Sequence, residues 1–375
     1  MKLGKIKVKH YINYAIIGTL TAVLSAIVLT GGRLDNSLLF LLEKAAISII
    51  LAVSLSLVVG FLGELSLGHA GFMCVGAYIG GKVASLLVPT MGNGIGAFLI
   101  ALVVGAGAAA LCGIIIGIPA LRLRGDYLAI VTLAFGEIVK SLFLNSSDET
   151  FGGSLGLATP RFDKRYMFII AFVLVLVTLY VVQNLMRSKH GRAITAIRDN
   201  EIAARASGTN VTKYKLLAFT VSAAFAGVAG VLYSYSNYTV QSIKFGYNYS
   251  IEILVMVVLG GMGSINGSII AAALITFLNT KLATILTGDL AVLQNLLYAL
   301  ILIVIVIYNN APALKGFRDK YNLGNLFAKF KKQDPATVHD DKAKWDVVPT
   351  KISMDEILSV DLTPQDTIYG NGGDE

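Results

Sequence analysis

Long apolar runs separated by short polar breaks constrain this chain more than any other feature of its sequence. The run YMFIIAFVLVLVTLYVV (166–182) is one of several that approach or exceed the roughly 18 apolar residues of a bilayer-spanning helix. Only 14% of the 375 residues are charged, whereas a soluble domain has about 25%. Unbroken runs also argue against a transmembrane β-barrel, whose strands alternate apolar and polar residues. The sequence therefore predicts an all-α, polytopic transmembrane helical bundle.

We expect about ten membrane helices, within a range of eight to ten. The expected segments are 11–30, 38–62, 70–88, 95–118, 127–144, 166–185, 214–236, 250–260, 267–286 and 290–308. The basic start resembles a signal peptide, but its apolar stretch is too long, so we expect a retained first helix. The chain then divides into an N-terminal segment (1–10), a transmembrane domain (11–310) and a tail (311–375).

Positive charges predict the orientation of these helices. The breaks 1–10, 63–69, 119–126, 186–215, 261–266 and 309–332 carry 19 Lys and Arg residues in total. The alternate breaks 31–37, 89–94, 145–165, 237–249 and 287–289 carry five. Because positive residues are retained on the cytoplasmic side, the first set is predicted to be cytoplasmic, together with both termini.

The break 186–215 is the one long polar segment between the apolar runs. It holds seven Lys or Arg residues but only two acids, and its part 194–207 has the Ala, Ile, Arg and Glu content of a short helix. Asp199 or Asn200 could cap a helical turn, and Gly208 offers a stop. From the residues alone, a solvated basic loop and a docking helix for a soluble partner both stay open.

Two glycine-rich stretches interrupt the apolar pattern, GFLGELSLGHAGF (60–72) and LGGMGSINGS (259–268). Such breaks in both halves of a transporter point to the translocation path, although tight turns and close helix packing are equally simple explanations. The predicted path or hinge residues are Gly63, Glu64, Ser66, Gly68, His69, Gly71, Gly260, Gly261, Gly263, Ser264 and Gly267.

Other polar residues are predicted to be structural. Glu137 and Lys140 share a helical face and can pair, and Glu252 can reach the outer surface from the end of its segment. Tyrosines near 237–249 are expected to form an interfacial belt; an aromatic ligand pocket is the alternative. Cys74 and Cys112 lie in apolar segments with no metal-ligand spacing.

Sequence motifs for enzymes are lacking. There is no GxxxxGK[ST] nucleotide-binding motif and no HExxH motif, so we expect neither catalytic residues nor a cofactor or metal bound by this chain. No basic stripe with interleaved aromatic residues indicates nucleic-acid binding. If transport is driven by ATP, the ATPase must be another polypeptide.

Four stretches resemble the permeases of branched-chain amino acid ABC transporters. They are GELSLGHAGFMCVGAYIGG (63–81), LRLRGDYLAIVTLAFGEIVKSLFLN (121–145), TAIRDNEIAARASGTNVTKYKLLAFTVSAAFAGVAGVLY (195–233) and LVMVVLGGMGSINGSIIAAAL (254–274). They occur in the order of that family, and the whole pattern is most similar to its M-type subunits. The resemblance implies the fold of an ABC importer permease in a bacterial cytoplasmic membrane.

The resemblance also implies partners and site residues. The partners are two ATPase subunits that use ATP-Mg, a second permease subunit, an extracytoplasmic binding protein and membrane lipid. Coupling to the ATPase is carried over to Ala203, Ala204 and Gly208, with Arg198, Asp199, Asn200 and Glu201 as flanking contacts. The spacing departs from the general coupling motif of ABC importers, because Ile202 separates Glu201 from the alanines and Gly208 is four residues past Ala204.

Two alternatives to a branched-chain amino acid importer are kept. Within the family, a urea or short-chain amide importer is the closest, and sugar permeases share the scaffold more distantly. Outside it, an ion-coupled carrier is possible, although no chain of intramembrane acids indicates a proton relay. The acidic stretch 333–375 lies outside the resemblance and is expected to be disordered. The basic residues of 315–332 are expected to contact anionic lipid.

Overall fold

The computed structural model describes residues 35–285 apart from 93, 124, 161 and 163, together with the isolated residues 18, 19, 300 and 303. The predicted helices at 11–30 and 290–308, both termini and the tail 311–375 therefore lie outside the described residues, except for those four positions. Within the described part, seven helices are long and apolar enough to cross a membrane. The predicted all-α membrane fold is confirmed there.

The helices follow the predicted segments closely. In chain order they are α2 (Asn36–Ser56) with its π-helical continuation η2 (Leu57–Leu62), α3 (His69–Met91), α4 (Ile95–Ala120), α5 (Asp126–Leu144), α6 (Asp148–Phe151), α7 (Lys164–Arg187), α8 (Lys189–Asp199), α9 (Glu201–Ala206), α10 (Val211–Ser236), η3 (Ser242–Phe245), α11 (Tyr247–Gly260) and α12 (Ile265–Ile285). The short strands β1 (Leu157–Ala158) and β2 (Thr239–Val240) pair antiparallel.

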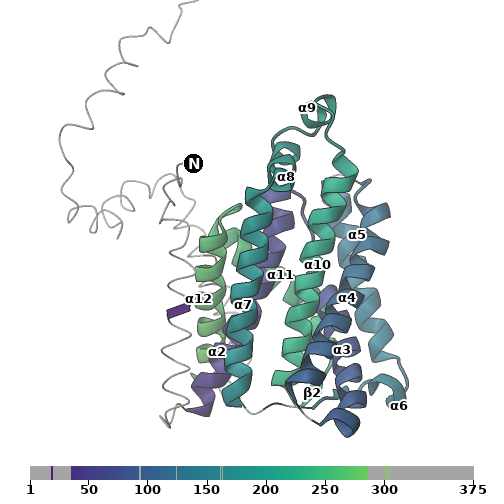
Figure 1. Cartoon of the computed structure of the whole chain (residues 1–375), viewed down its shortest axis with the longest axis vertical. Coiled ribbons are helices and arrows are strands. Elements are labelled where there is room, and N and C mark those ends of the chain that lie inside the picture. The colour runs from purple at the N-terminus through teal and green to yellow at the C-terminus, as the bar shows by residue number, and fades with distance from the viewer. Residues whose placement is uncertain are drawn as a thin grey trace, which may run out of the picture. The chain divides into compact units, whose positions relative to one another are not determined.

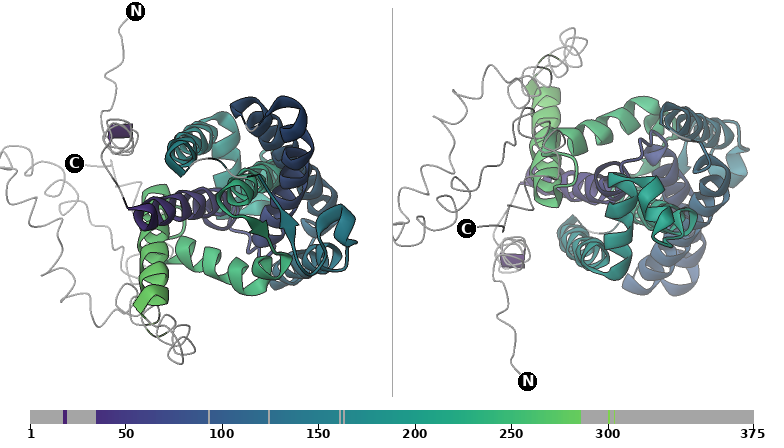
Figure 2. Two further views of the ribbon diagram at one scale, coloured as in Figure 1. Left: turned by 90° about the horizontal axis from the view of Figure 1, so that it is seen from below. Right: turned by 90° about the horizontal axis from the view of Figure 1, so that it is seen from above.

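Helix α10 lies at the centre of the bundle, packed against α3, α4 and α2 (Figure 1). Small residues allow this close packing, since a Cβ on Gly76 of α3 would collide with the backbone at Gly227 of α10. Helix α12 lies at the margin, beside α2 and α11 (Figure 2). The arrangement buries α10 and the C-terminal half of α2 most deeply.

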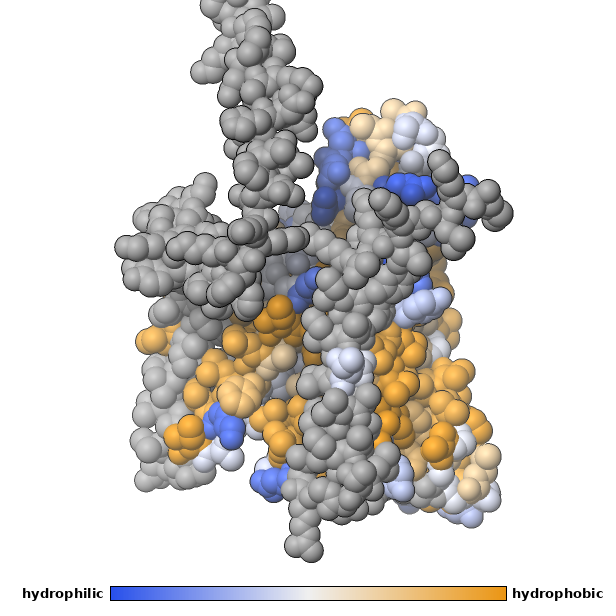
Figure 3. Space-filling model, turned by 60° about the vertical axis from the view of Figure 1, so that its left-hand side comes forward, coloured by the Kyte–Doolittle hydropathy of each residue, from blue (hydrophilic) through white to orange (hydrophobic). Residues whose placement is uncertain are grey.

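The outer faces are apolar, as a lipid environment requires. On α4, the side chains of Val103, Leu111 and Ile115 are all more than half exposed. Apolar residues form a broad band over the molecule, and hydrophilic residues gather toward the end that carries α8 and α9 (Figure 3). An exposed apolar band of this kind is typical of lipid contact.

Four of the predicted cytoplasmic breaks meet at one end of the bundle. Residues of the 63–68 linker, the start of α5 and the segment 197–201 line one cavity there. Arg198 also reaches Gly60 of η2, close to Gly263 in the turn before α12. The strand pair and α6 lie at the opposite end (Figure 1). The alternation of sides that the positive charges predicted is therefore present in the fold.

The first glycine-rich break folds back into the bundle. After Gly63, whose φ of 79° is left-handed, the backbone N–H of Leu67 donates to Thr132 Oγ1 of α5 at 3.0 Å. At the start of α3, His69 Nε2 lies 2.8 Å from Ser54 Oγ. Ser54 is eight residues before the end of η2, about 12 Å along a helix. Helix α3 thus begins inside the bundle, not at its surface.

The segment between α10 and α11 also enters the interior. Tyr78 Oη of α3 donates to the carbonyl of Val240 at 3.0 Å, and the backbone N–H of Tyr247 donates to Glu137 Oε1 of α5 at 2.8 Å. Both side chains belong to the middle of spanning helices. This explains why α11 has only 14 residues, because it begins partway through the bundle. The predicted exposed outer loop 237–249 is therefore partly buried.

Candidate functional site

A cavity of about 480 Å³ opens at the end of the bundle where α8 and α9 lie. It is lined by Leu62, Gly63, Glu64, Leu65, Gly125, Asp126, Ile197, Arg198, Asp199, Asn200, Glu201 and Lys215. The set combines four predicted coupling residues with two predicted path residues, Gly63 and Glu64. The structure therefore brings these two predicted groups to one place.

The predicted single helix over 194–207 is two helices. Asn200 has extended backbone angles, φ −159° and ψ 105°, between α8 and α9. Its side chain accepts from the N–H of Ala203 at 3.0 Å, so Asn200 is the predicted cap of a helical turn. Gly208, at φ 83°, follows the end of α9, as the predicted stop. The break at Asn200 turns α9 away from α8 (Figure 1).

Lys215 of α10 joins the coupling segment to the first glycine-rich break. Its Nζ lies 2.5 Å from Glu64 Oε1 and 3.1 Å from Glu201 Oε2, and its side chain is only 5% exposed. Charges this far from water are retained when they are paired. No role beyond its charge could be predicted for Lys215, because its partner Glu64 is 151 residues away in the sequence.

Arg198 makes a second connection. Its Nη1 donates to the carbonyl oxygen of Gly60 in η2 at 3.2 Å, and its Nε and Nη2 donate to Asp199 Oδ1. A Cβ on Gly263 would lie 3.4 Å from the same Nη1. The guanidinium thus lies against both glycine-rich breaks, which are about 200 residues apart in the sequence.

The predicted coupling alanines differ in their surroundings. Ala204 is 5% exposed, whereas Ala203 is exposed. Ile202, next to Ala203, is 78% exposed. The sequence analysis assigned no role to Ile202. On a helix of six residues, the exposure of a side chain depends on tertiary packing and cannot be predicted from the sequence pattern. The surface of α9 available to a partner therefore consists of Ile202, Ala203, Arg205 and Ala206.

The remaining predicted path residues pack closely against other backbone segments. A Cβ on Gly68 would collide with Thr132, and one on Gly71 with Gly136. Gly260 and Gly267 approach each other across the turn between α11 and α12. Ser66 and His69 are buried, while Gly261 and Ser264 belong to that turn. Their role in a path or hinge stays a prediction.

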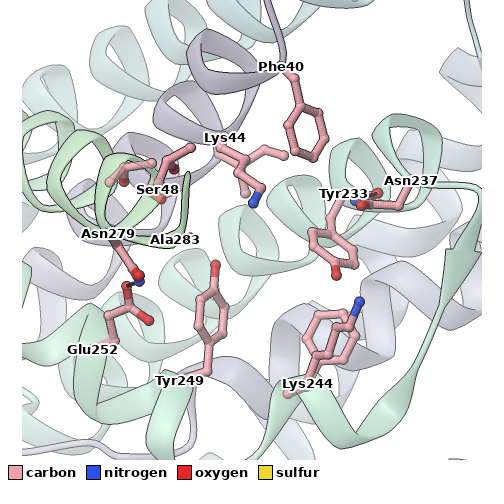
Figure 4. Close-up of a pocket in the computed structure, with 14 residues that line it drawn as sticks. Phe40, Lys44, Ser48, Tyr233, Asn237, Lys244, Tyr249, Glu252, Asn279 and Ala283 are labelled. Atoms are coloured by element: carbon pink, nitrogen blue, oxygen red, sulfur yellow. Dashed lines mark hydrogen bonds between the residues drawn. The ribbon is translucent and has the colours of Figure 1, made fainter. Parts of the chain in front are cut away.

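A second pocket, of about 500 Å³, includes the beginning of α2 and the end of α10 in its lining (Figure 4). It is lined by Phe40, Lys44, Ile47, Ser48, Tyr233, Asn237, Lys244, Phe245, Tyr249, Glu252, Thr276, Asn279, Thr280 and Ala283. Glu252 is half-buried and accepts from Asn279 Nδ2 at 3.0 Å, so it does not extend to the outer surface as expected.

The tyrosines near 237–249 do not form a single belt. Tyr233 and Tyr249 line the second pocket and Tyr235 is fully buried, whereas Tyr238 and Tyr247 are exposed. Two of the five tyrosines thus line a pocket, and its role as a ligand site stays a prediction. The predicted Glu137–Lys140 pair is present. Among the described residues, no group of three or more His, Cys, Asp or Glu side chains could hold a metal ion.

The family of the branched-chain amino acid transport system, permease component, matches residues 37–307. That range includes both cavities and every helix listed above except for the first residue of α2. The chain belongs to this family. Membership, together with seven apolar helices of spanning length, makes it a multi-pass membrane protein of the transporter permease class. The resemblance found in the four sequence stretches is confirmed.

Several curated relatives are similar over part of the chain. The high-affinity branched-chain amino acid transport system permease protein LivM of Escherichia coli K12 is 39% identical over 260 residues, which is 61% of this chain and 60% of LivM. A probable LivM of Methanocaldococcus jannaschii is 28% identical, over 58% of this chain and 73% of its own. The ribose import permease RbsC of E. coli K12 is 28% identical, over 73% and 86%. No solved structure matches.

Proposed function

We propose that this chain is a membrane-spanning permease subunit of an ABC importer for branched-chain amino acids. The chain spans 60% of the length of its first curated relatives, which are named as branched-chain amino acid permeases. The observation that carries the proposal is the connection of α8 and α9 to both glycine-rich breaks through Arg198 and Lys215. A permease that is driven by separate ATPase subunits needs such a connection between its docking surface and its membrane helices.

In this proposal the partner ATPases dock on the exposed side of α9. Ile202 and Ala203 supply a small apolar contact, and Asp199 and Arg205, both largely exposed, set its register by charge. Closure of the ATPases on ATP would shift α9. Lys215 would transmit the shift to Glu64 in the 63–68 linker, and Arg198 would transmit it to η2.

The remaining parts of the proposal concern the assembly. The chain would reside in the cytoplasmic membrane of a bacterium with both termini in the cytoplasm, beside a second permease subunit. Two ATPase subunits would hydrolyse ATP-Mg on the cytoplasmic side, and this chain would bind no cofactor and catalyse no reaction. An extracytoplasmic binding protein would deliver substrate to the opposite end, which includes the segment 145–165.

Reconstitution tests this function. The test uses proteoliposomes that contain the chain, its second permease, the ATPases and the binding protein. They should transport labelled leucine only when ATP is supplied on the side of the membrane where the ATPases are bound. Uptake driven by an ion gradient without ATPases would contradict the proposal. Saturable uptake of urea or ribose without leucine uptake would retain the importer and change its substrate.

The Ala203→Trp variant tests the docking surface. Because Ala203 is exposed, tryptophan should leave folding intact but hold the ATPase away, reducing leucine uptake per ATP hydrolysed by about tenfold, the effect of roughly 1.4 kcal/mol of lost coupling. Ile115→Trp, on the lipid-facing side of α4, is the matched control. Equal uptake per ATP hydrolysed in both variants would mean that α9 is a solvated segment and not a docking surface.

A further inference from the structure

The second pocket contains three charged side chains from elements far apart in the sequence. Lys44 comes from α2, Lys244 from η3 and Glu252 from α11. Figure 4 shows both ammonium groups and the hydroxyls of Tyr233 and Tyr249 turned toward the same space, with the Glu252 carboxylate beside Asn279. Tertiary structure alone brings this combination together.

These three charges have no ion-pair partner within 4.0 Å among the residues that the structure describes. Lys44 lies over the ring of Phe40, with Nζ 4.7 Å from the ring centroid. Charged side chains among apolar helices usually pair with each other or face a polar ligand. A cavity with two cations on one side and a carboxylate on another provides opposite charges for one dipolar ligand.

The walls of the pocket add apolar surface and a hydroxyl group to these charges. The aromatic rings of Phe40 and Phe245 and the methyl of Ala283 present apolar surface to the pocket. Thr276 is 6% exposed, and its Oγ1 has no hydrogen-bond partner among the described residues. This hydroxyl lines the pocket and can act there as a hydrogen-bond donor or acceptor. The volume of about 500 Å³ is in the range of small-molecule sites.

We infer that this pocket binds a zwitterionic α-amino acid with an apolar side chain. Lys44 and Lys244 face its carboxylate, Glu252 faces its ammonium group, and the aromatic wall contacts its side chain. The inference depends on the proposed function for the choice of substrate class. It adds that the site lies within this subunit, at the end remote from α9, where substrate arrives from outside the cell.

Binding to the purified full-length chain in lipid nanodiscs tests the site. The probes are leucine, 4-methylpentanoate (which lacks the ammonium group) and leucinamide (which lacks the carboxylate). Leucine should bind saturably and at least about tenfold more tightly than either analogue, because each analogue leaves one charged group of the pocket unmatched. No saturable leucine binding overturns the inference.

Charge-removing variants give a sharper outcome. Glu252→Gln should abolish the preference for leucine over 4-methylpentanoate and keep its preference over leucinamide. Lys44→Gln and Lys244→Gln should do the reverse, and Lys244→Arg should retain the original pattern. Lys281→Gln, an exposed lysine of α12 outside the pocket, is the matched control. A uniform loss of both preferences in every variant, as a folding defect would give, contradicts the assigned contacts.

Two further measurements separate this inference from its alternatives. Displacement of leucine by O-phosphoethanolamine at equal or lower concentration would identify a lipid headgroup site and overturn the amino acid assignment. Normal ATP-driven leucine uptake by all three charge-removing variants would overturn the site and leave the importer standing. Charge-specific leucine binding without any ATP-driven uptake would leave the site standing and overturn the importer.

Discussion

At the residue scale, the buried ammonium group of Lys215 contributes to stability through its ion pairs. This lysine lies in the interior of the bundle end, held between two carboxylates that come from different helices or linkers. Removing Lys215 would leave the Glu64 carboxylate without its cation, whereas Glu201 would keep Arg205, and breaking a buried ion pair costs about 3–5 kcal/mol. The local sequence does not predict the burial and ion pairing of Lys215, because it is one of several basic residues in a basic segment.

Lys215→Met is therefore expected to lower the free energy of unfolding by about 3 kcal/mol, since the Glu64 carboxylate would lose its cation. Unfolding of the purified chain in detergent measures the change. Adding Glu64→Gln to Lys215→Met should restore much of the loss, because the uncompensated charge is removed. Lys213→Met, two residues away and exposed, is the control and should differ little from the parent. Equal losses at 213 and 215 would refute the ionic explanation.

At the element scale, helices α9 and α10 illustrate opposite uses of small residues. On α9, small residues leave a surface free; on α10, they allow helices to approach closely. A Cβ on Gly227 would lie 2.6 Å from Ala109 Cβ of α4 and 3.1 Å from Ala106 Cα. Gly107 of α4, by contrast, has open space around it.

Gly227→Ala should destabilise the bundle by about 2 kcal/mol, because a packed interface cannot accept an added methyl without shifting backbone. Gly107→Ala is the matched control and should be neutral or stabilising by up to about 1 kcal/mol, since alanine favours the helix. Thermal unfolding of both variants provides the comparison. If both alanines are tolerated equally, the close α4–α10 contact is not important for stability.

The proposed docking of the ATPases depends on the exposed side of helix α9. Ile202→Asp should leave stability nearly unchanged, because the side chain is 78% exposed. It should weaken ATPase association by about tenfold, as expected when an apolar contact at the centre of an interface is lost. Co-purification of the ATPases with the variant, at matched permease amounts, checks this. Leu155→Asp, 74% exposed at the other end, is the control, and association reduced equally by both would argue against docking at α9.

At the scale of the whole molecule, the fold fixes which breaks share an end but leaves open which end faces the cytoplasm. Positive charge predicts that α8 and α9 are cytoplasmic. A single cysteine at Ala203 should then react with a membrane-impermeant maleimide only in inside-out vesicles, and one at Tyr238 only in intact spheroplasts. Both positions are exposed, and Cys74 is buried. Replacing Cys112 by alanine removes the other background thiol, and the reverse labelling pattern would invert the topology.

The sequence by itself determined the membrane class, the boundaries of eight described helices and the grouping of the breaks between them. These properties depend on local quantities: the length of an apolar run, the positions of glycines and the placement of positive charge. The cap at Asn200 and the stop at Gly208 were predictable for the same reason, since both act on backbone groups within three residues. Family membership followed from four such stretches in order.

Tertiary structure decided the rest. The Lys215–Glu64 pair joins positions 151 residues apart, and Lys44, Lys244 and Glu252 meet only because α2, η3 and α11 pack around one pocket. The inward course of residues 237–246 depends on hydrogen bonds to Tyr78 and Glu137 of other helices. Periodicity reports which residues share a face of one helix, but not which faces meet. Partners distant in sequence are therefore set by packing, and the charges that matter most here are of that kind.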